Sequence, residues 1–295
     1  MIDYHLHLWA HGKRDIGPTI DDLASYAEKA KENGVVEIAI TEHLFRFVQT
    51  DKILGSYFRR YPDTEMRSYM ENYWKDHARA DLDHYVEVAL AAKAAGLDVV
   101  VGMEVDYYEG EMDKVSELLA GYPFDVLLGS IHWVRDWPFD HTESSLVQGY
   151  WDTIGVEAAW AAYTTALEEL ADSRAIDVLA HPDLIKIMGK FPTVPEEFYD
   201  RMAEAARRSE IAAEVSSAGF RKPIGQEYPA PYLLQKFKEY GVEITTASDA
   251  HNLGDVSKDF ERIRRIVVAA GYHSVKGFRS RKANYIQISQ QEGQN

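Results

Sequence analysis

The chain begins Met1-Ile2-Asp3-Tyr4-His5-Leu6-His7-Leu8-Trp9-Ala10-His11-Gly12, an apolar run that contains two histidines one residue apart. Side chains of a β-strand alternate between its two faces, so His5 and His7 point to the same side, with Asp3 beside them. Two imidazoles next to a carboxylate form a bidentate grip for a metal ion. The pair alone is weak evidence, since many such histidines are ordinary surface or core residues.

Six further short apolar segments follow, which makes seven predicted strands with the opening segment. At least six of these seven end in a His, Asp or Glu, the residue types that bind metals. We expect strands at about 35–40, 97–103, 124–131, 176–180, 211–216 and 242–248. Between them the sequence predicts helices at about 19–33, 76–95, 111–120, 151–171, 195–208, 229–240 and 257–270. This alternation predicts a parallel sheet flanked by helices. Side chains spread over nearly every strand end favour a closed β/α barrel with its site at that end.

Length and composition limit the class of protein. The 295 residues suit a single barrel domain spanning 1–295, with a last short strand near 284–288 outside the main sheet. The net charge of −16 argues against binding to nucleic acid, which needs cationic contacts to phosphate. Cysteine is absent, so a metal must be bound by His, Asp and Glu. Without a secretory signal or a long apolar run, we expect a cytoplasmic protein that does not enter the membrane.

Residues 44–75 interrupt the rhythm after the second predicted strand. This segment is long for a connection between a strand and a helix, and it is rich in aromatic and cationic residues. It is either a structural excursion that covers one end of the barrel or a lid that brings positive charge to an anionic substrate.

The candidate metal ligands lie at the strand ends or just beyond them. They exceed the three or four protein ligands of one zinc ion and would supply two or three ions. Multi-metal sites of this kind suit phosphoryl transfer, where ions clamp the attacking and leaving oxygens. The candidates are His5, His7, His11, His43, Glu104, His132, His181, Asp249 and His251.

These stretches together resemble the polymerase and histidinol phosphatase (PHP) superfamily, in particular its histidinol-phosphatase branch. The resemblance runs from residue 3 to about 271 and implies a distorted (β/α)7 TIM-like barrel. It rests on Asp3-Tyr4-His5-Leu6-His7, Thr41-Glu42-His43, Gly102-Met103-Glu104-Val105-Asp106-Tyr107, the run from Phe124 to His132, Ala180-His181-Pro182-Asp183-Leu184, Ser248-Asp249-Ala250-His251, and the branch-like stretches 218–223 and 227–229.

The resemblance also implies how the ligands divide among divalent ions, which could be zinc, manganese or iron. His5, His7, Glu104 and Asp249 would bind the first ion, and Glu104 would bridge to a second, completed by His132 and His181. A third would lie on His11, His43 and His251. Two departures weaken the match: His11-Gly12 comes about two residues early, and Glu214-Val215-Ser216 replaces the usual Glu-Ile-Asn.

The resemblance implies hydrolysis of a small phosphate monoester. The leading candidate substrate is L-histidinol phosphate, an intermediate of histidine biosynthesis. A hydroxide bridging two metals would attack phosphorus, with Glu104 and Asp249 as the catalytic carboxylates and Asp249 able to carry protons. Phosphate contacts could come from Arg221 and Lys222, which could equally belong to a solvated loop. Substrate contacts could come from Trp133 and Ser130. Alternatively, Trp133 only forms part of the pocket wall and Ser130 caps a turn.

Three other functions remain open at this stage. A PHP phosphoesterase could act on nucleotides or other small phosphate esters, with pocket residues at 44–75 and 133–149 deciding. A non-catalytic accessory module, like the PHP domains attached to DNA polymerases, fits the acidic charge poorly. A hydrolase of C–N bonds on a related barrel would place a lysine between the metals, where Glu104 stands here. The sequence does not determine the oligomeric state.

Overall fold

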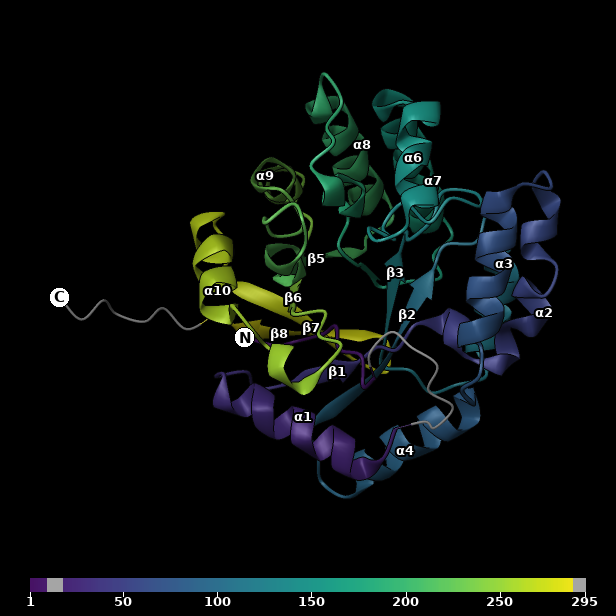
Figure 1. The fold of residues 1–295 in the computed structure, drawn as a ribbon. Coiled ribbons are helices and arrows are strands. Elements are labelled where there is room, and N and C mark those ends of the chain that lie inside the picture. Colours follow the sequence, from purple (N-terminus) through teal and green to yellow (C-terminus); the bar gives the residue numbers. More distant parts are fainter. Residues whose placement is uncertain (10–17, 289–295) are drawn as a thin grey trace.

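The structure, a computed structural model, describes residues 1–9 and 18–288. Strands and helices alternate along the chain, and the helices surround the sheet (Figure 1). The strands of the main sheet are β1 (Ile38–Ile40), β2 (Val99–Asp106), β3 (Val126–Ser130), β4 (Val178–Leu179), β5 (Ala212–Ser216) and β6 (Ile244–Ala247). The longer helices are α1 (Ile20–Glu32), α3 (Glu65–His77), α4 (Leu82–Ala94), α5 (Met112–Leu119), α6 (Ser145–Ile154), α7 (Val156–Asp172), α8 (Pro195–Arg208), α9 (Pro231–Glu239) and α10 (Phe260–Ala269).

The six strands form one parallel sheet in the order β1-β2-β3-β4-β5-β6. Residues 3–7 lie between its two edges. The amide of Asp3 donates to the carbonyl of Glu37 beside β1, and the amide of Tyr4 donates to the carbonyl of Thr246 in β6. The N-terminal segment therefore closes the sheet into a ring of seven parallel segments, which confirms the predicted TIM-like barrel.

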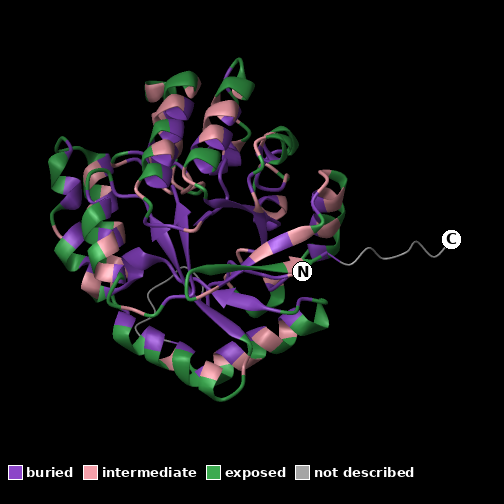
Figure 2. Cartoon of the chain, turned by 180° about the vertical axis from the view of Figure 1, so that it is seen from behind, coloured by how far each residue is buried: buried purple, intermediate pink, exposed green. Residues whose placement is uncertain are grey.

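Burial explains why these short runs form strands. Every residue of the six strands is buried, as Figure 2 shows for the centre of the molecule. One layer of side chains, including Val100, Val126 and Val178, fills the barrel, and a second layer packs beneath the helices. Such near-continuous apolar runs are typical of parallel strands covered on both faces.

Two predicted helices are each split in the structure. The helix expected at 76–95 is the end of α3 followed by α4, and Asp81 caps α4 by accepting from the amide of Asp83. The helix expected at 151–171 is α6 followed by α7, separated at Gly155, whose φ is 78°. A left-handed residue cannot continue a right-handed helix, and glycine adopts this conformation without steric cost.

A hairpin of β7 (Ser274–Arg279) and β8 (Lys282–Gln287) closes the amino-terminal end of the barrel. The amide of Phe278 donates to the hydroxyl of Tyr4 inside the barrel at 3.0 Å. Arg279 pairs with Asp98, and Arg281 pairs with Asp177, which are acidic residues just before β2 and β4. The expected final strand therefore lies outside the main sheet, and it leaves the opposite, carboxyl end of the barrel open for a site.

Residues 44–75 form a helical excursion between β1 and α4. It contains the short helices η1 (Leu44–Arg46), η2 (Val48–Thr50), α2 (Asp51–Leu54) and η3 (Tyr57–Arg60), and then most of α3. Its arginines pair with acidic groups: Arg60 with Glu111 and Arg67 with Asp63. Movement of this segment as a lid stays a prediction.

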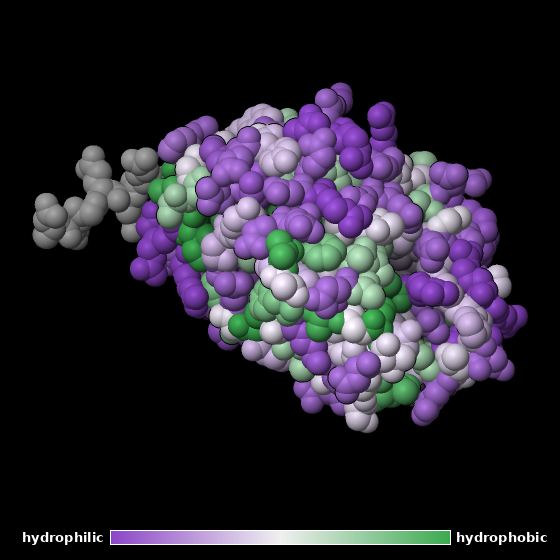
Figure 3. All heavy atoms as spheres, turned by 90° about the horizontal axis from the view of Figure 1, so that it is seen from above, coloured by the Kyte–Doolittle hydropathy of each residue, from purple (hydrophilic) through white to green (hydrophobic). Residues whose placement is uncertain are grey.

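The outer surface is mainly hydrophilic. Seen from above, hydrophobic side chains gather in the middle of one face and charged or polar side chains surround them (Figure 3). Within residues 1–9 and 18–288, no helix combines the length and the apolar character needed to cross a membrane.

Candidate metal centre

Eight of the nine predicted ligands meet at the carboxyl end of the barrel. They come from the N-terminal segment and from β2 or the turns after β1, β3, β4 and β6. The carboxyl ends of parallel strands share one rim, so residues distant in the sequence converge there. The eight are His5, His7, His43, Glu104, His132, His181, Asp249 and His251. The ninth, His11, lies outside the described residues.

Glu104 lies at the centre of this group, and its two oxygens face different histidines. Oε2 lies 3.2 Å from Nε2 of His5 and 3.4 Å from Nε2 of His7. Oε1 lies 3.1 Å from Nε2 of His181 and 3.4 Å from Nε2 of His132. One fully buried carboxylate thus joins two sets of imidazoles, which is the arrangement of a carboxylate that bridges two cations.

The side chains form overlapping groups whose ligand atoms lie within 4.8 Å of one another. One contains His5, His7 and Asp249, and a second contains His5, Glu104 and His181. A third contains His7, His43 and His251, so His7 stands where the family resemblance placed His11. A further group, His43, Asp106 and His132, was not foreseen from the sequence.

The spacing and the missing hydrogen bonds of these side chains suit the binding of divalent cations. Nε2 of His5, Nε2 of His7 and Oε2 of Glu104 are buried and make no hydrogen bond to the described part of the chain. Ligands around a tetrahedral ion with bonds of about 2.0 Å are roughly 3.3 Å apart, close to the 3.2 and 3.4 Å separations here. Imidazole nitrogens and carboxylate oxygens suit zinc, manganese and iron.

A second layer of carboxylates holds the imidazoles in place. Glu214 Oε2 lies 2.8 Å from Nδ1 of His5, and Asp106 Oδ1 lies 2.7 Å from Nδ1 of His132. Glu42 Oε1 lies 3.3 Å from Nδ1 of His7. In each pair the ring nitrogen that faces the carboxylate is the one remote from the cluster. Such partners fix the tautomer and orientation of a metal-binding histidine.

Arg46 extends the second layer into the excursion. Its Nη1 lies 3.2 Å from Oε1 of Glu42 and also donates to the carbonyl of Trp9 at 3.3 Å. The first cationic residue of the 44–75 segment therefore supports Glu42 behind the cluster. Its side chain is 2% exposed.

The charges of the cluster reinforce one another. Burial lowers the pKa of His5, but attraction from Glu214, Glu104 and Asp249 outweighs it and raises that pKa well above its usual value. Burial raises the pKa of Glu104, but the neighbouring His43, His5 and His132 hold it well below its usual range. In the absence of metal, His5 therefore holds a proton beside ionised Glu104, and a cation must displace that proton. Burial instead holds the pKa of His43 and of His251 well below the usual value.

Two of the converging residues adopt an unusual backbone conformation. The φ of His181 is 26° and that of Asp249 is 51°, both in the left-handed region that side chains with a Cβ rarely occupy. Each residue lies two positions after the end of a strand, and its side chain belongs to the cluster. Such strain persists where the surrounding structure enforces it and is concentrated at functional sites.

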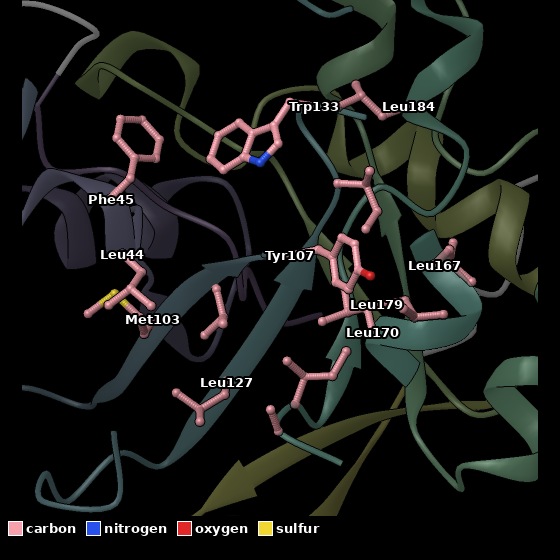
Figure 4. Close-up of a cluster of buried hydrophobic side chains, with 14 of the residues drawn as sticks. Leu44, Phe45, Met103, Tyr107, Leu127, Trp133, Leu167, Leu170, Leu179 and Leu184 are labelled. Atoms are coloured by element: carbon pink, nitrogen blue, oxygen red, sulfur yellow. The ribbon is translucent and has the colours of Figure 1, made fainter. Parts of the chain in front are cut away.

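A cavity of about 430 Å³ opens over the cluster. Its floor includes His43, His132, His181, Asp249 and His251. Apolar walls come from the excursion, the turn after β3 and η4 (Leu184–Met188). Figure 4 shows Phe45, Trp133 and Leu184 beyond the ends of the strands, above the deeper core residues. The cavity has the size of a small-molecule site.

The four residues predicted to contact substrate have different positions. Trp133 and Lys222 line the cavity. Ser130 is buried at the end of β3, with Oγ 3.4 Å from Nδ1 of His132. Arg221 donates to the carbonyl of Ser248 at 2.5 Å, so it braces the turn before Asp249 and is not among the residues that line the cavity.

Three residues near the cluster, Asp3, Asp140 and His141, are not among the predicted ligands or substrate contacts. Asp3 does not join the cluster, because its carboxylate accepts hydrogen bonds from the amides and hydroxyls of Ser248 and Ser257. Asp140 lines the cavity from an irregular loop, whose sequence has no periodicity that predicts the direction of a side chain. His141 also lines it and forms a 2.9 Å hydrogen bond between Nδ1 and the hydroxyl of Tyr69.

Comparison with protein families matches residues 5–218 to the PHP domain. The chain belongs to the PHP domain family. The matched range contains six of the eight described candidate ligands. The other two, Asp249 and His251, follow β6 in the C-terminal part of the barrel.

The similar curated proteins are named as phosphatases. A "Probable histidinol-phosphatase" of Deinococcus radiodurans is 27% identical over 285 residues, which covers 96% of this PHP chain and 98% of that protein. A "Probable histidinol-phosphatase" of Schizosaccharomyces pombe is 24% identical, covering 86% of this chain and 82% of that one.

Solved structures show the same fold. A candidate histidinol phosphatase from Listeria monocytogenes superposes with a TM-score of 0.70 at 18% identity, covering 89% of this chain and 99% of that chain. Histidinol phosphate phosphatase from Lactococcus lactis, in complex with zinc, L-histidinol and phosphate, gives a TM-score of 0.62 at 18% identity. That alignment covers 96% of this chain and 98% of the Lactococcus chain.

Proposed function

We propose that this PHP protein is a metal-dependent phosphatase that hydrolyses L-histidinol phosphate to L-histidinol and phosphate. The observation that carries the proposal is Glu104, whose two oxygens face separate sets of histidines beneath a cavity of small-molecule size. The names of the Deinococcus and Schizosaccharomyces relatives, and the L-histidinol and phosphate held by the Lactococcus neighbour, support the choice of substrate.

The metal ligands in this proposal are the eight described residues of the cluster. His5, His7, Glu104 and Asp249 form the first site; Glu104, His132 and His181 form the second; His43 and His251, with His7 beside them, form a third. Two or three zinc, manganese or iron ions bound there supply Lewis acidity that activates water and neutralises charge on the phosphoryl oxygens.

The chain itself supplies binding, orientation and a proton path. Lys222 lines the cavity and offers a positive charge to the phosphoryl oxygens. Asp249 faces both the cluster and the cavity, with Oδ1 3.3 Å from Nε2 of His7. During hydrolysis the bond from phosphorus to the leaving oxygen breaks and one forms to the oxygen of water. A proton passes from water to the leaving alkoxide, and Asp249 is placed to carry it.

A phosphoesterase for nucleotides or other small phosphate esters is the alternative. The test is kcat/KM for L-histidinol phosphate, adenosine monophosphate and 4-nitrophenyl phosphate, measured on the metal-loaded protein. We expect L-histidinol phosphate to be preferred by about a hundredfold or more, which corresponds to roughly 2.7 kcal/mol of transition-state binding. Similar rates on all three esters would support phosphatase activity but contradict the assignment of L-histidinol phosphate as the preferred substrate.

A further inference from the structure

The cavity carries acidic groups that the metal centre does not use. Asp140 and Glu143, in the loop between β3 and α6, line the cavity but belong to none of the groups that could hold a metal. Lys222 is the single Lys or Arg side chain in the cavity lining formed by the described residues. Carboxylates beside the path of an anionic ester repel it, unless the ester also carries a positive charge that they attract.

Asp140 has no partner for its buried oxygen. Oδ1 is removed from water and makes no hydrogen bond to residues 1–9 or 18–288. A buried acceptor without a donor destabilises a fold, so its presence at a cavity wall points to a donor supplied by a ligand. The charge of Asp140 reaches the cavity: after burial, it is the next cause that raises the pKa of Tyr73.

Trp133 provides an independent, complementary observation. Its side chain lines the same cavity and is 4% exposed, and the Nε1 donor has no acceptor in the described chain. Outside the candidate metal ligands, the described lining of the cavity therefore offers an unpaired acceptor, Asp140 Oδ1, and an unpaired donor, Trp133 Nε1, both on the loop that follows β3. A matching ligand has a donor, preferably cationic, and an acceptor in its alcohol portion.

We infer that Asp140 and Trp133 form the subsite that recognises the alcohol portion of the substrate. Asp140 accepts a hydrogen bond from an ammonium group, and Trp133 donates to an acceptor nitrogen of a neutral heteroaromatic ring. This inference rests on the proposed function, because L-histidinol phosphate carries both groups. It extends that function by assigning specificity for amino-alcohol phosphates to two residues outside the metal centre.

The test compares two substrates in two enzymes. L-Histidinol phosphate and 3-(imidazol-4-yl)propyl phosphate, which lacks the ammonium group, are assayed with metal-loaded wild type and Asp140→Asn. We expect wild type to prefer the aminated ester by about 30-fold or more in kcat/KM, because a charge-assisted hydrogen bond is lost with the amine. In Asp140→Asn the preference should fall to within about threefold, and hydrolysis of 4-nitrophenyl phosphate, which has no ammonium group, should fall much less than that of L-histidinol phosphate.

The matched control is Asp136→Asn. Asp136 lies in the same loop but lines a separate hollow, where Oδ2 accepts a hydrogen bond from Thr64 Oγ1 at 3.4 Å. It should keep the wild-type preference. Trp133→Phe tests the second contact: it should weaken the preference for L-histidinol phosphate over the phosphate of L-phenylalaninol, whose ring lacks the acceptor nitrogen.

Calorimetric binding of L-histidinol to the metal-loaded proteins gives a readout that does not depend on turnover. We expect Asp140→Asn to raise the Kd about tenfold or more. An unchanged substrate preference, an unchanged Kd or an equal loss on 4-nitrophenyl phosphate would overturn the subsite. Failure of wild type to hydrolyse L-histidinol phosphate would instead overturn the proposed function, and the Kd comparison would still decide the subsite.

Discussion

The imidazole of His5 lies between two carboxylates, with Nδ1 2.8 Å from Glu214 Oε2 and Nε2 3.2 Å from Glu104 Oε2. Glu104 comes from β2 and Glu214 from β5, so the ring is held from both sides of the barrel interior. Glu214 Oε1 also accepts from the amide of His181 at 3.3 Å. One buried residue thus positions two of the proposed ligands.

Replacement of Glu214 by Gln should weaken metal binding without removing a ligand. The amide keeps the size of the side chain but loses the charge that orients His5, and such changes cost about 10- to 100-fold in metal affinity or activity. Competition with a chelator of known affinity measures the effect. Glu87→Gln, on the exposed face of α4, is the control and should bind metal as wild type does. Wild-type affinity in Glu214→Gln would contradict the positioning role.

Replacement of Glu104 by Gln should remove the link between two metal sites. A neutral amide cannot bridge two cations, so we expect loss of at least one bound ion and a fall in kcat of about a thousandfold or more. Elemental analysis of the purified variant gives the metal content beside the rate. Glu117→Gln, an exposed substitution in α5, should change neither quantity. Full metal content together with full activity in Glu104→Gln would contradict the role of Glu104 as a bridge between two metal ions.

Lys222 should contribute to binding of the phosphate group. A charge-assisted hydrogen bond is worth about 1.5–3 kcal/mol, so Lys222→Met should lower kcat/KM about 10- to 100-fold. Arg221→Met should act differently, because Arg221 braces the carbonyl of Ser248 and the turn before Asp249. We expect it to reduce thermal stability and metal content more than it raises KM. Lys31→Met, on the exposed face of α1, serves as control; equal effects of all three would refute these roles.

The metal-free and metal-loaded proteins should respond differently to pH. Burial lowers the pKa of His5 and His7, but the carboxylates around them outweigh it and raise both pKa values above the usual value. Without metal, the folded state therefore binds protons that the unfolded state releases above about pH 6.5. This stabilisation is complete at lower pH and is lost as pH rises through the raised pKa values.

Metal binding has the opposite dependence, because the cation replaces those protons. The difference in Tm between loaded and chelator-treated protein should therefore widen between pH 6.5 and 8.5. Taking this difference cancels the contribution to Tm of titratable groups that are remote from the site, because both forms share them. Thermal unfolding of both forms across this range measures it, and a constant or shrinking difference would show that His5 and His7 do not exchange protons for metal.

The barrel and the cluster were predictable because both depend on local patterns. Short apolar runs that end in His, Asp or Glu identify buried parallel strands, and parallel strands bring their carboxyl ends to one rim. The pattern therefore predicts that His5, Glu104 and Asp249 lie together at this rim. The split at Gly155 was missed because one glycine in a helical pattern does not reveal its φ.

The rest of the site depends on tertiary contacts that no short pattern encodes. Glu214 lies within a strand, and its contact with His5 joins residues 209 positions apart. Asp140 belongs to an irregular loop, where neither spacing nor propensity indicates the direction of a side chain. Asp3 shares the alternation of His5 and His7, but it is turned away by hydrogen bonds from Ser248 and Ser257, far along the chain.

The central claim is that metal bound at this rim is required to release phosphate from L-histidinol phosphate. The direct measurement is phosphate release by protein stripped with a chelator and titrated with zinc, manganese or iron. We predict no release by the stripped protein, then a rise to a plateau at two to three equivalents of metal per chain. Release that persists without metal, or its absence with every metal, would contradict the claim.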